Sequence, residues 1–272
     1  MTTANHVEKR GALLTVSDVS LTLGGNIILH GVNCQVEDFV GHGQVVGFLG
    51  PSGIGKSQFL RILAGLNKPD TGSVLVTEKQ VPVEVGMVGV VAQHYPLFEH
   101  KSVLGNLTFA ARRAGSKRAE AREKAMAMLK RFGLTDRKDF WPAQLSGGQR
   151  QRVAIAQQLL CSEHFILMDE PFSGLDPIVL DEVCKLIKET ADAHELNTII
   201  VVTHDVDAAV AVADTLWLMG RDHDQEGNII PGARIKTKYD LVERGLAWRP
   251  DVVYTADFSD CVREVRKQFW SL

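Results

Sequence analysis

Residues 50–57 read GPSGIGKS, between a short apolar run at 44–49 and a segment at 57–66 whose apolar residues recur at helical spacing. The order strand, glycine-rich loop, helix is that of a phosphate-binding loop with the pattern G-x-x-x-x-G-K-[ST]. Its glycines let successive backbone N–H groups point at phosphate oxygens, beside the positive end of the following helix. The loop therefore predicts nucleotide binding, in which Lys56 reaches the β and γ phosphates and Ser57 ligates Mg²⁺. The predicted binding residues are Gly50, Pro51, Ser52, Gly53, Ile54, Gly55, Lys56 and Ser57.

A second motif, FILMDE at 165–170, places two carboxylates directly after four apolar residues. If the apolar run is a parallel strand, both acids emerge at the carboxyl end of the strand, where such sheets bind ligands. An acidic turn after a strand is common by itself, but here it follows a phosphate loop. We expect Asp169 to hold Mg²⁺ and Glu170 to take a proton from the attacking water.

A third motif, LSGGQ at 145–149, precedes the helical sequence RQRVAIAQQLL. The spacing predicts a capping box, in which Ser146 caps the helix and Gln149 reaches back to it. Gly147 and Gly148 leave the backbone N–H groups at the helix start uncovered, which makes an anion site. Since the phosphate loop is already complete, this second site indicates contact with the nucleotide of another molecule.

The rest of the chain alternates strands and helices. Strands are expected at 13–23, 26–36, 44–49, 165–169, 197–203 and 215–219, and helices at 57–66, 177–191 and 205–213. Residues 93–158 predict an α-helical lobe inserted between strands. The fold class is therefore α/β, with a mainly parallel core sheet and an antiparallel β edge. We divide the chain into a domain at 1–220 and a tail at 221–272, which comprises a surface hairpin at 221–234 and an amphipathic helix at 258–270.

Composition excludes several classes of protein. The 272 residues include 30 basic and 33 acidic ones, for a formal charge of −3, so nothing global attracts nucleic acid. The four cysteines lack CxxC spacing, which argues against a zinc site or a disulfide scaffold. The sequence shows neither a signal peptide nor an apolar stretch of about 20 residues that could span a bilayer. We expect a cytoplasmic protein.

The motifs together resemble the ATP-binding subunit of ABC transporters over residues 12–220. Residues 50–57 are similar to that family's Walker A motif, 145–149 to its signature, and 165–170 to its Walker B motif. Gln93 matches the Q-loop, Asp176 in SGLDP the D-loop, and His204 in THD the H-loop. The fold implied is a P-loop NTPase cassette with a helical lobe, and the cofactors implied are ATP and Mg²⁺.

The resemblance also implies roles and partners. Gln93 would contact Mg²⁺ and the γ-phosphate, and His204 would orient the attacking water. Two cassettes would pair head to tail, so that residues 146–149 of a second copy complete each ATP site. A transmembrane permease is expected to bind near 93–107, where Tyr95, Leu97 and Phe98 are either docking residues or ordinary lobe core. A solute-binding protein is a further candidate partner, and the cassette would lie on the inner face of the membrane.

Several positions depart from the family pattern, and the most consequential is Leu23, which stands where an aromatic residue usually stacks on adenine. Leu23 is expected to cover the base by apolar contact, unless an aromatic residue from elsewhere does so. The importer of a small polar solute, such as a polar amino acid, nitrate, sulfonate or taurine, is the favoured reading. Its alternatives are an exporter ATPase, a soluble ABC ATPase acting on DNA or the ribosome, and a nucleotide-binding module without hydrolysis.

Overall fold

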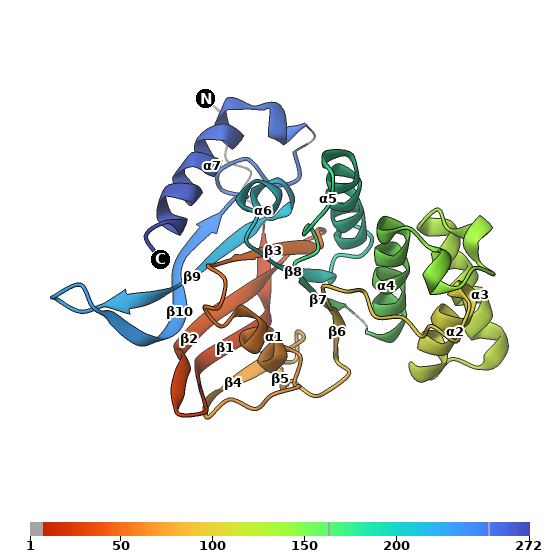
Figure 1. Cartoon of the computed structure of the whole chain (residues 1–272), viewed down its shortest axis with the longest axis horizontal. Coiled ribbons are helices and arrows are strands. Elements are labelled where there is room, and N and C mark those ends of the chain that lie inside the picture. The colour runs from red at the N-terminus through yellow and green to blue at the C-terminus, as the bar shows by residue number, and fades with distance from the viewer. Residues whose placement is uncertain (1–7, 163, 250) are drawn as a thin grey trace.

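The computed structural model describes residues 8–162, 164–249 and 251–272, and its centre is one mixed sheet (Figure 1). Among these residues the sheet has ten strands in the order β5-β4-β1-β2-β10-β9-β3-β8-β7-β6. The strands are β1 (Lys9–Leu23), β2 (Asn26–Phe39), β3 (Gln44–Leu49), β4 (Thr71–Val76), β5 (Val81–Pro82), β6 (Val88–Val91), β7 (Phe165–Asp169), β8 (Thr198–Thr203), β9 (Thr215–His223) and β10 (Ile229–Asp240). The helices are α1 (Lys56–Leu63), α2 (Val103–Arg113), α3 (Arg118–Arg131), α4 (Gly147–Cys161), α5 (Pro177–Ala191), α6 (Val206–Val212) and α7 (Ala256–Phe269).

The parallel part of the sheet brings the motif loops to one edge. β3 pairs in parallel with β8 and β9, β7 pairs with β8, and β6 pairs with β7. The carboxyl ends of these strands therefore lie at the same edge, where ligands bind in open α/β sheets. The phosphate loop, Gln93 and His204 follow β3, β6 and β8 respectively, while Asp169 ends β7 and Glu170 comes directly after it.

Strand β3 is buried along its whole length because helices cover both of its faces. Val46 and Phe48 pack into the cluster that contains α1, and the rings of Phe48 and Phe59 lie 5.5 Å apart. Val45 belongs to the cluster that contains α5 and the lobe helices α2, α3 and α4, and Leu49 to the cluster that contains α6 and α7. This alternation is the period of two expected of a strand, so QVVGFL is held rigidly where it delivers the phosphate loop.

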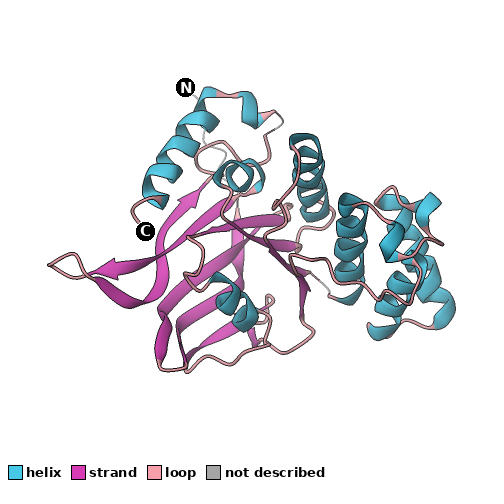
Figure 2. Ribbon diagram, viewed as in Figure 1, coloured by secondary structure: helices cyan, strands magenta, loops and turns pink. Residues whose placement is uncertain are grey.

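An antiparallel edge completes the sheet, so the α/β fold class expected from the sequence is confirmed. β1 pairs antiparallel with both β2 and β4. The β1–β2 turn is formed by Gly24 and Gly25 at φ angles of 57° and 81°, a region that favours glycine. The inserted lobe consists of α2, α3 and α4 and stands to one side of the sheet (Figure 2).

The surface hairpin expected at 221–234 is confirmed, but the sequence did not predict that its second strand joins the main sheet. β9 continues to His223, and β10 runs from Ile229 to Asp240 between β9 and β2, so the residues after 220 contribute a strand to the main sheet. The hairpin formed by the end of β9 and the start of β10 projects from the sheet (Figure 1), and its turn is closed by the N–H of Asp224, which donates to the carbonyl of Asn228 over 2.9 Å. The short strands β4, β5 and β6 were not predicted. The expected terminal helix is α7.

No helix in the described part of the chain is long and apolar enough to cross a membrane.

Candidate functional site

The phosphate loop owes its shape to two glycines. Gly53 and Gly55 adopt φ angles of 76° and 114°, and Gly55 is the N-cap of α1. A Cβ atom on Gly55 would lie 2.9 Å from Cγ2 of Ile28 in β2, so a side chain there would both clash and strain the backbone. The loop can therefore close over the start of α1 only with glycine at this position.

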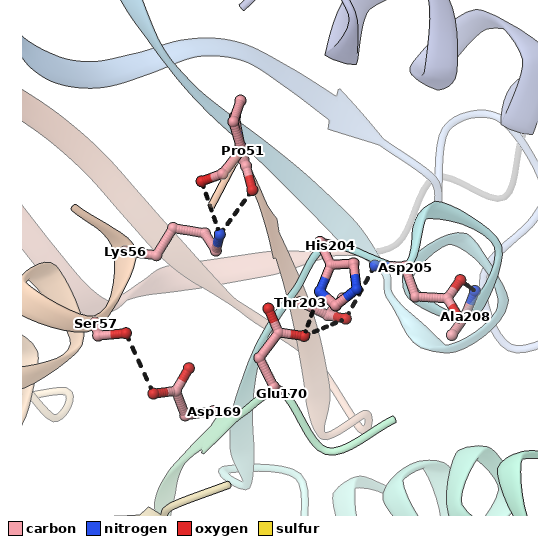
Figure 3. A network of polar contacts seen from close by, with 10 residues as sticks. Pro51, Lys56, Ser57, Asp169, Glu170, Thr203, His204, Asp205 and Ala208 are labelled. Carbon is pink, nitrogen blue, oxygen red and sulfur yellow. Dashed lines mark hydrogen bonds and ion pairs between the residues drawn. The ribbon is translucent and has the colours of Figure 1, made fainter. Parts of the chain in front are cut away.

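Lys56 holds its charge inside the loop. Its side chain is 8% exposed, and Nζ donates to the carbonyl oxygens of Gly50 over 2.7 Å and Pro51 over 3.0 Å (Figure 3). Burial lowers the pKa of Lys56, while the nearby carboxylates of Glu170 and Asp169 oppose that shift. The ammonium group is thus pre-positioned where phosphate oxygens would replace carbonyl oxygens as its partners.

Ser57 and Asp169 meet across the site. The hydroxyl of Ser57 donates to Oδ2 of Asp169 over 3.3 Å, which joins the start of α1 to the end of β7 (Figure 3). Burial raises the pKa of Asp169, a shift that a bound cation would oppose. A hydroxyl and one carboxylate match the few protein oxygens that Mg²⁺ takes beside substrate phosphates. The described residues contain no group of three His, Cys, Asp or Glu side chains that could hold a metal by themselves.

The backbone conformation of Glu170 sets the direction of its side chain. It adopts a φ angle of 50°, unusual for a residue with a side chain, and its N–H donates to the carbonyl of Val202 over 2.8 Å. Its Oε2 atom accepts from the hydroxyl of Thr203 over 3.1 Å and lies 2.9 Å from Nδ1 of His204. The carboxylate is thereby fixed between β7 and β8, facing the phosphate loop (Figure 3).

Thr203, the first residue of the THD motif, is a site residue for which no role was predicted. It ends β8, has no exposed surface, donates to Glu170, and accepts from the N–H of Asp205 over 3.1 Å. The signal available in the sequence was that a polar residue, Thr203, ends an apolar strand directly before His204. Asp205 caps α6 by accepting from the N–H of Ala208 over 3.0 Å, so His204 stands between two anchored neighbours.

Two predicted residues lie at the margins of the site. Gln93 is exposed and lies two residues after the end of β6, at the same edge of the sheet as Asp169 and Glu170. Leu23 is the last residue of β1 and is 41% exposed at the tip of the β1–β2 hairpin. The Gln93 amide makes no hydrogen bond to another described residue that would fix it.

The signature motif stands apart from the phosphate loop of the same chain. It begins α4 in the helical lobe, well separated from α1 (Figure 1). The expected capping box is present, because the N–H of Gln149 donates to Ser146 Oγ over 3.3 Å and Ser146 N–H donates to Gln149 Oε1 over 3.1 Å. A Cβ on Gly147 would meet nothing within 4 Å, so packing within this chain does not require glycine there.

Contacts within this chain are also made by Asp176 and by the apolar and aromatic residues near Gln93. Asp176 caps α5 by accepting from the N–H groups of Ile178 and Val179 over 3.0 and 3.1 Å. Tyr95 and Leu97 pack against the core shared by the lobe and the sheet. Phe98 forms an edge-to-face pair with Phe109, with ring centroids 4.8 Å apart, and Phe109 is 37% exposed.

Helix α7 borders the site, which the sequence did not indicate. A hollow of about 470 Å³ is lined by Pro51, Ser52 and His204 on one side and by Arg266 and Trp270 of the α7 region on the other. Arg266 forms an ion pair with Asp207 of α6. A larger cavity of about 600 Å³ lies beside α5 and contains none of the predicted site residues.

Comparison with known proteins identifies relatives of this architecture. Residues 30–173 match a protein family described as ABC transporter. A probable amino-acid ABC transporter ATP-binding protein of Haemophilus influenzae is 37% identical over 231 residues, which cover 80% of this chain and 88% of that protein. The arginine transport ATP-binding protein ArtM of Bacillus subtilis is 37% identical over 216 residues, which cover 76% of this chain and 87% of ArtM.

A longer relative and a solved structure extend the comparison. The sulfate/thiosulfate import ATP-binding protein CysA of Thermosynechococcus vestitus is 38% identical over 211 residues, which cover 76% of this chain and 61% of CysA. The structure of CbiO1 from Clostridium perfringens, described as part of the ABC transporter complex CbiONQ, superposes with a TM-score of 0.72 at 29% identity. It covers 85% of this chain and 89% of CbiO1.

Proposed function

The chain belongs to the ABC transporter family as an ATP-binding subunit, and from this premise we propose that it drives the import of a small polar solute. It is an ATPase whose hydrolysis of ATP powers transport through a permease partner. Import is supported by relatives named for amino-acid, arginine, sulfate/thiosulfate and Fe(3+) transport or import. Amino acids head this set because the chain covers 88% and 87% of the relatives named for amino-acid and arginine transport, but only 61% and 60% of those named for sulfate/thiosulfate and Fe(3+) import.

One observation carries the proposed hydrolytic site. Oε2 of Glu170 is held by Thr203 and His204 at the edge of the sheet where Lys56, Ser57 and Asp169 converge. A carboxylate positioned in this way can serve as a general base for water, a role that typically contributes about 10²- to 10⁴-fold in rate. The site thus combines a base with a phosphate-binding loop.

The reaction follows from the positions of these groups. The backbone N–H groups of residues 53–57 and the Nζ of Lys56 would bind the β and γ phosphates of ATP. Glu170 accepts a proton from water, the water oxygen bonds to the γ-phosphorus, and the bond from that phosphorus to the bridging oxygen of ADP breaks. Lys56 and His204 offset the charge on the phosphoryl oxygens, which is the main demand of phosphoryl transfer.

Ser57 and Asp169 would hold Mg²⁺, because their oxygens already meet at 3.3 Å. The ion supplies neutralisation of phosphate charge when it is bound. Gln93, exposed at the same edge, would join these ligands and link the site to the permease.

A second copy of the chain would complete each ATP site. The proposed contact is between Ser146, Gly147, Gly148 and Gln149 of one copy and the γ-phosphate bound by the other. It is supported by the position of α4 away from the phosphate loop of its own chain and by the open space in front of Gly147. Asp176 would lie near the same dimer interface. The cassette is then placed on the cytoplasmic face of a membrane through its permease, with a solute-binding protein as a further partner of an importer.

The substitution Glu170→Gln tests the proposed site. It keeps the shape of the side chain but removes the base, so steady-state ATP turnover should fall at least about 10²-fold while ATP still binds. Binding is measured with a fluorescent ATP analogue, and dimer formation in ATP by size-exclusion chromatography. Glu182→Gln, on the exposed surface of α5, is the matched control and should keep full turnover. Undiminished turnover in Glu170→Gln would remove Glu170 from the mechanism.

A further inference from the structure

The carbonyl oxygen of Pro171, one residue after Glu170, accepts two side-chain hydrogen bonds. The hydroxyl of Tyr95 donates over 3.1 Å and the Nε2 of Gln151 donates over 3.0 Å. Tyr95 comes from the loop after Gln93, and Gln151 from α4, the helix that begins with the signature motif. Three segments with separate proposed tasks therefore converge on one atom, which no motif of the sequence indicated.

The surroundings of this contact are buried. Pro171 is buried and Gln151 has no exposed surface. Burial raises the pKa of Tyr95 to about 12, so its hydroxyl keeps its proton and can donate at any physiological pH. The Oε1 atom of Gln151 is buried without a partner in the described structure, so Gln151 is held here by the bond that it donates. Hydrogen bonds in such a setting are stronger than bonds exposed to water.

Tyr95 is also tied to α4 through its backbone. Nε of Arg150 donates to the carbonyl of Tyr95 over 3.3 Å, and the guanidinium of Arg150 forms an ion pair with Glu99 in the same loop. Successive residues of α4 therefore hold both ends of the contact, since Arg150 binds Tyr95 and Gln151 binds Pro171. A shift of α4 must move the Tyr95 loop and the Pro171 carbonyl together or break these bonds.

Backbone strain lies at both sides of the contact. Tyr95 has a φ angle of 46° and Glu170 a φ angle of 50°, conformations that persist only where surrounding contacts enforce them. Proline restricts the residue before it, and its own φ is fixed by the ring. Fixing the Pro171 carbonyl therefore limits the movement of the peptide that carries the Glu170 side chain.

We propose that Tyr95 is a positioning residue for Glu170, which through the Pro171 carbonyl ties the orientation of that carboxylate to the loop after Gln93. The proposal rests on the proposed function, in which Glu170 is the general base and that loop faces the permease. Tyr95 itself touches neither water nor nucleotide in this role.

The substitution Tyr95→Phe tests the proposal, since it removes only the hydroxyl and keeps the packed ring. With the purified chain, kcat for ATP should fall about tenfold while KM for ATP stays within about twofold, because the base is misplaced and the phosphate loop is intact. The chain offers a matched control among its three tyrosines, Tyr254→Phe, whose side chain is 86% exposed and whose kcat should not change.

A second variant distinguishes an effect on the position of Glu170 from an effect on the stability of the protein. Gln151→Met removes the other donor to Pro171, and a double-mutant cycle with Tyr95→Phe should give effects on kcat that are not additive. An unchanged kcat in Tyr95→Phe would overturn the proposal. A fall in melting temperature and in nucleotide affinity together with the fall in kcat would overturn it as well. If Glu170→Gln abolishes turnover while Tyr95→Phe leaves kcat unchanged, only this inference fails, whereas full turnover in Glu170→Gln would reject the proposed function itself.

Discussion

Nδ1 of His204 lies 2.9 Å from Oε2 of Glu170, and the two residues follow the neighbouring parallel strands β8 and β7. The contact fixes the ring through Nδ1, and His204 lines the hollow that is also lined by Pro51 and Ser52 of the phosphate loop. The side chain of His204 is 57% exposed, whereas that of Glu170 is 16% exposed. The histidine therefore has room to meet a ligand, while the carboxylate is held in place behind it.

His204→Ala should lower ATP turnover about 10²-fold, which is the usual loss when one donor to a developing charge is removed. ATP affinity should change little, because Lys56 and the loop N–H groups supply most of the phosphate contacts. His204→Gln should recover part of the turnover, since its amide can still donate. Turnover is measured by phosphate release and affinity with a fluorescent ATP analogue.

The matched control for His204 is His223→Ala. His223 is exposed at the end of β9, away from the motif loops, so its removal should leave turnover unchanged. Equal turnover in His204→Ala and the wild type would show that the imidazole does not act in hydrolysis.

Gly147→Asp should abolish ATP turnover without unfolding the protein. A side chain at this position meets nothing within 4 Å, and an aspartate in the first turn of α4 is favourable to the helix dipole. The same carboxylate would repel phosphate at the uncovered helix start. The melting temperature should thus stay at or slightly above that of the wild type while ATP turnover is lost.

Mixing Gly147→Asp with Lys56→Ala tests whether each ATP site is shared by two chains. Lys56→Ala lacks the phosphate-loop charge, so each variant is inactive alone. In a head-to-tail dimer of the two variants, one site combines the intact loop of the Gly147→Asp chain with the intact signature of the other. Turnover should therefore return in part on mixing. A mixture that stays inactive would contradict a shared site. Lys68→Ala is the control for loss of charge, because Lys68 is an exposed lysine after α1.

The motif loops were predictable because each one follows a short apolar run. QVVGFL and FILMD are buried strands, and parallel strands with helical crossovers place their carboxyl ends together whatever the exact register. The approach of Lys56, Ser57, Asp169 and Glu170 therefore followed from the order of elements alone. The capping box at Ser146 was equally local, since it needs only four consecutive residues.

Contacts between side chains far apart in the chain were not predictable in this way. The bonds from Thr203 to Glu170 and from Tyr95 to Pro171 join residues 33 and 76 positions apart, and they depend on strand register and on a left-handed backbone at Tyr95 and Glu170. Neither residue type favours that conformation. The place of β10 between β2 and β9 likewise depends on packing across the sheet, which polar residues in a hairpin do not reveal.

Asp214 should make the stability of the protein fall as the pH rises. The carboxyl group is 4% exposed, and Oδ2 accepts from the N–H of Val45 over 2.7 Å. Burial raises its pKa from 3.8 to about 8. Between these two values the folded state keeps a proton that the unfolded state has lost, so the free energy of unfolding decreases with rising pH across this window.

Asp214→Asn should remove this dependence, because its amide oxygen can still accept from Val45 but carries no proton to lose. The melting temperature of the variant minus that of the wild type should therefore increase between about pH 5 and pH 8 and level off above, by at least about 2–4 °C, the shift that corresponds to about 1 kcal/mol. Differential scanning fluorimetry across this range measures it. Asp181→Asn, an equal change of charge at an exposed position of α5, should give a curve parallel to that of the wild type. A constant difference between Asp214→Asn and the wild type would mean that Asp214 is ionised in the folded protein throughout, and that its hydrogen bond with Val45 compensates for burial.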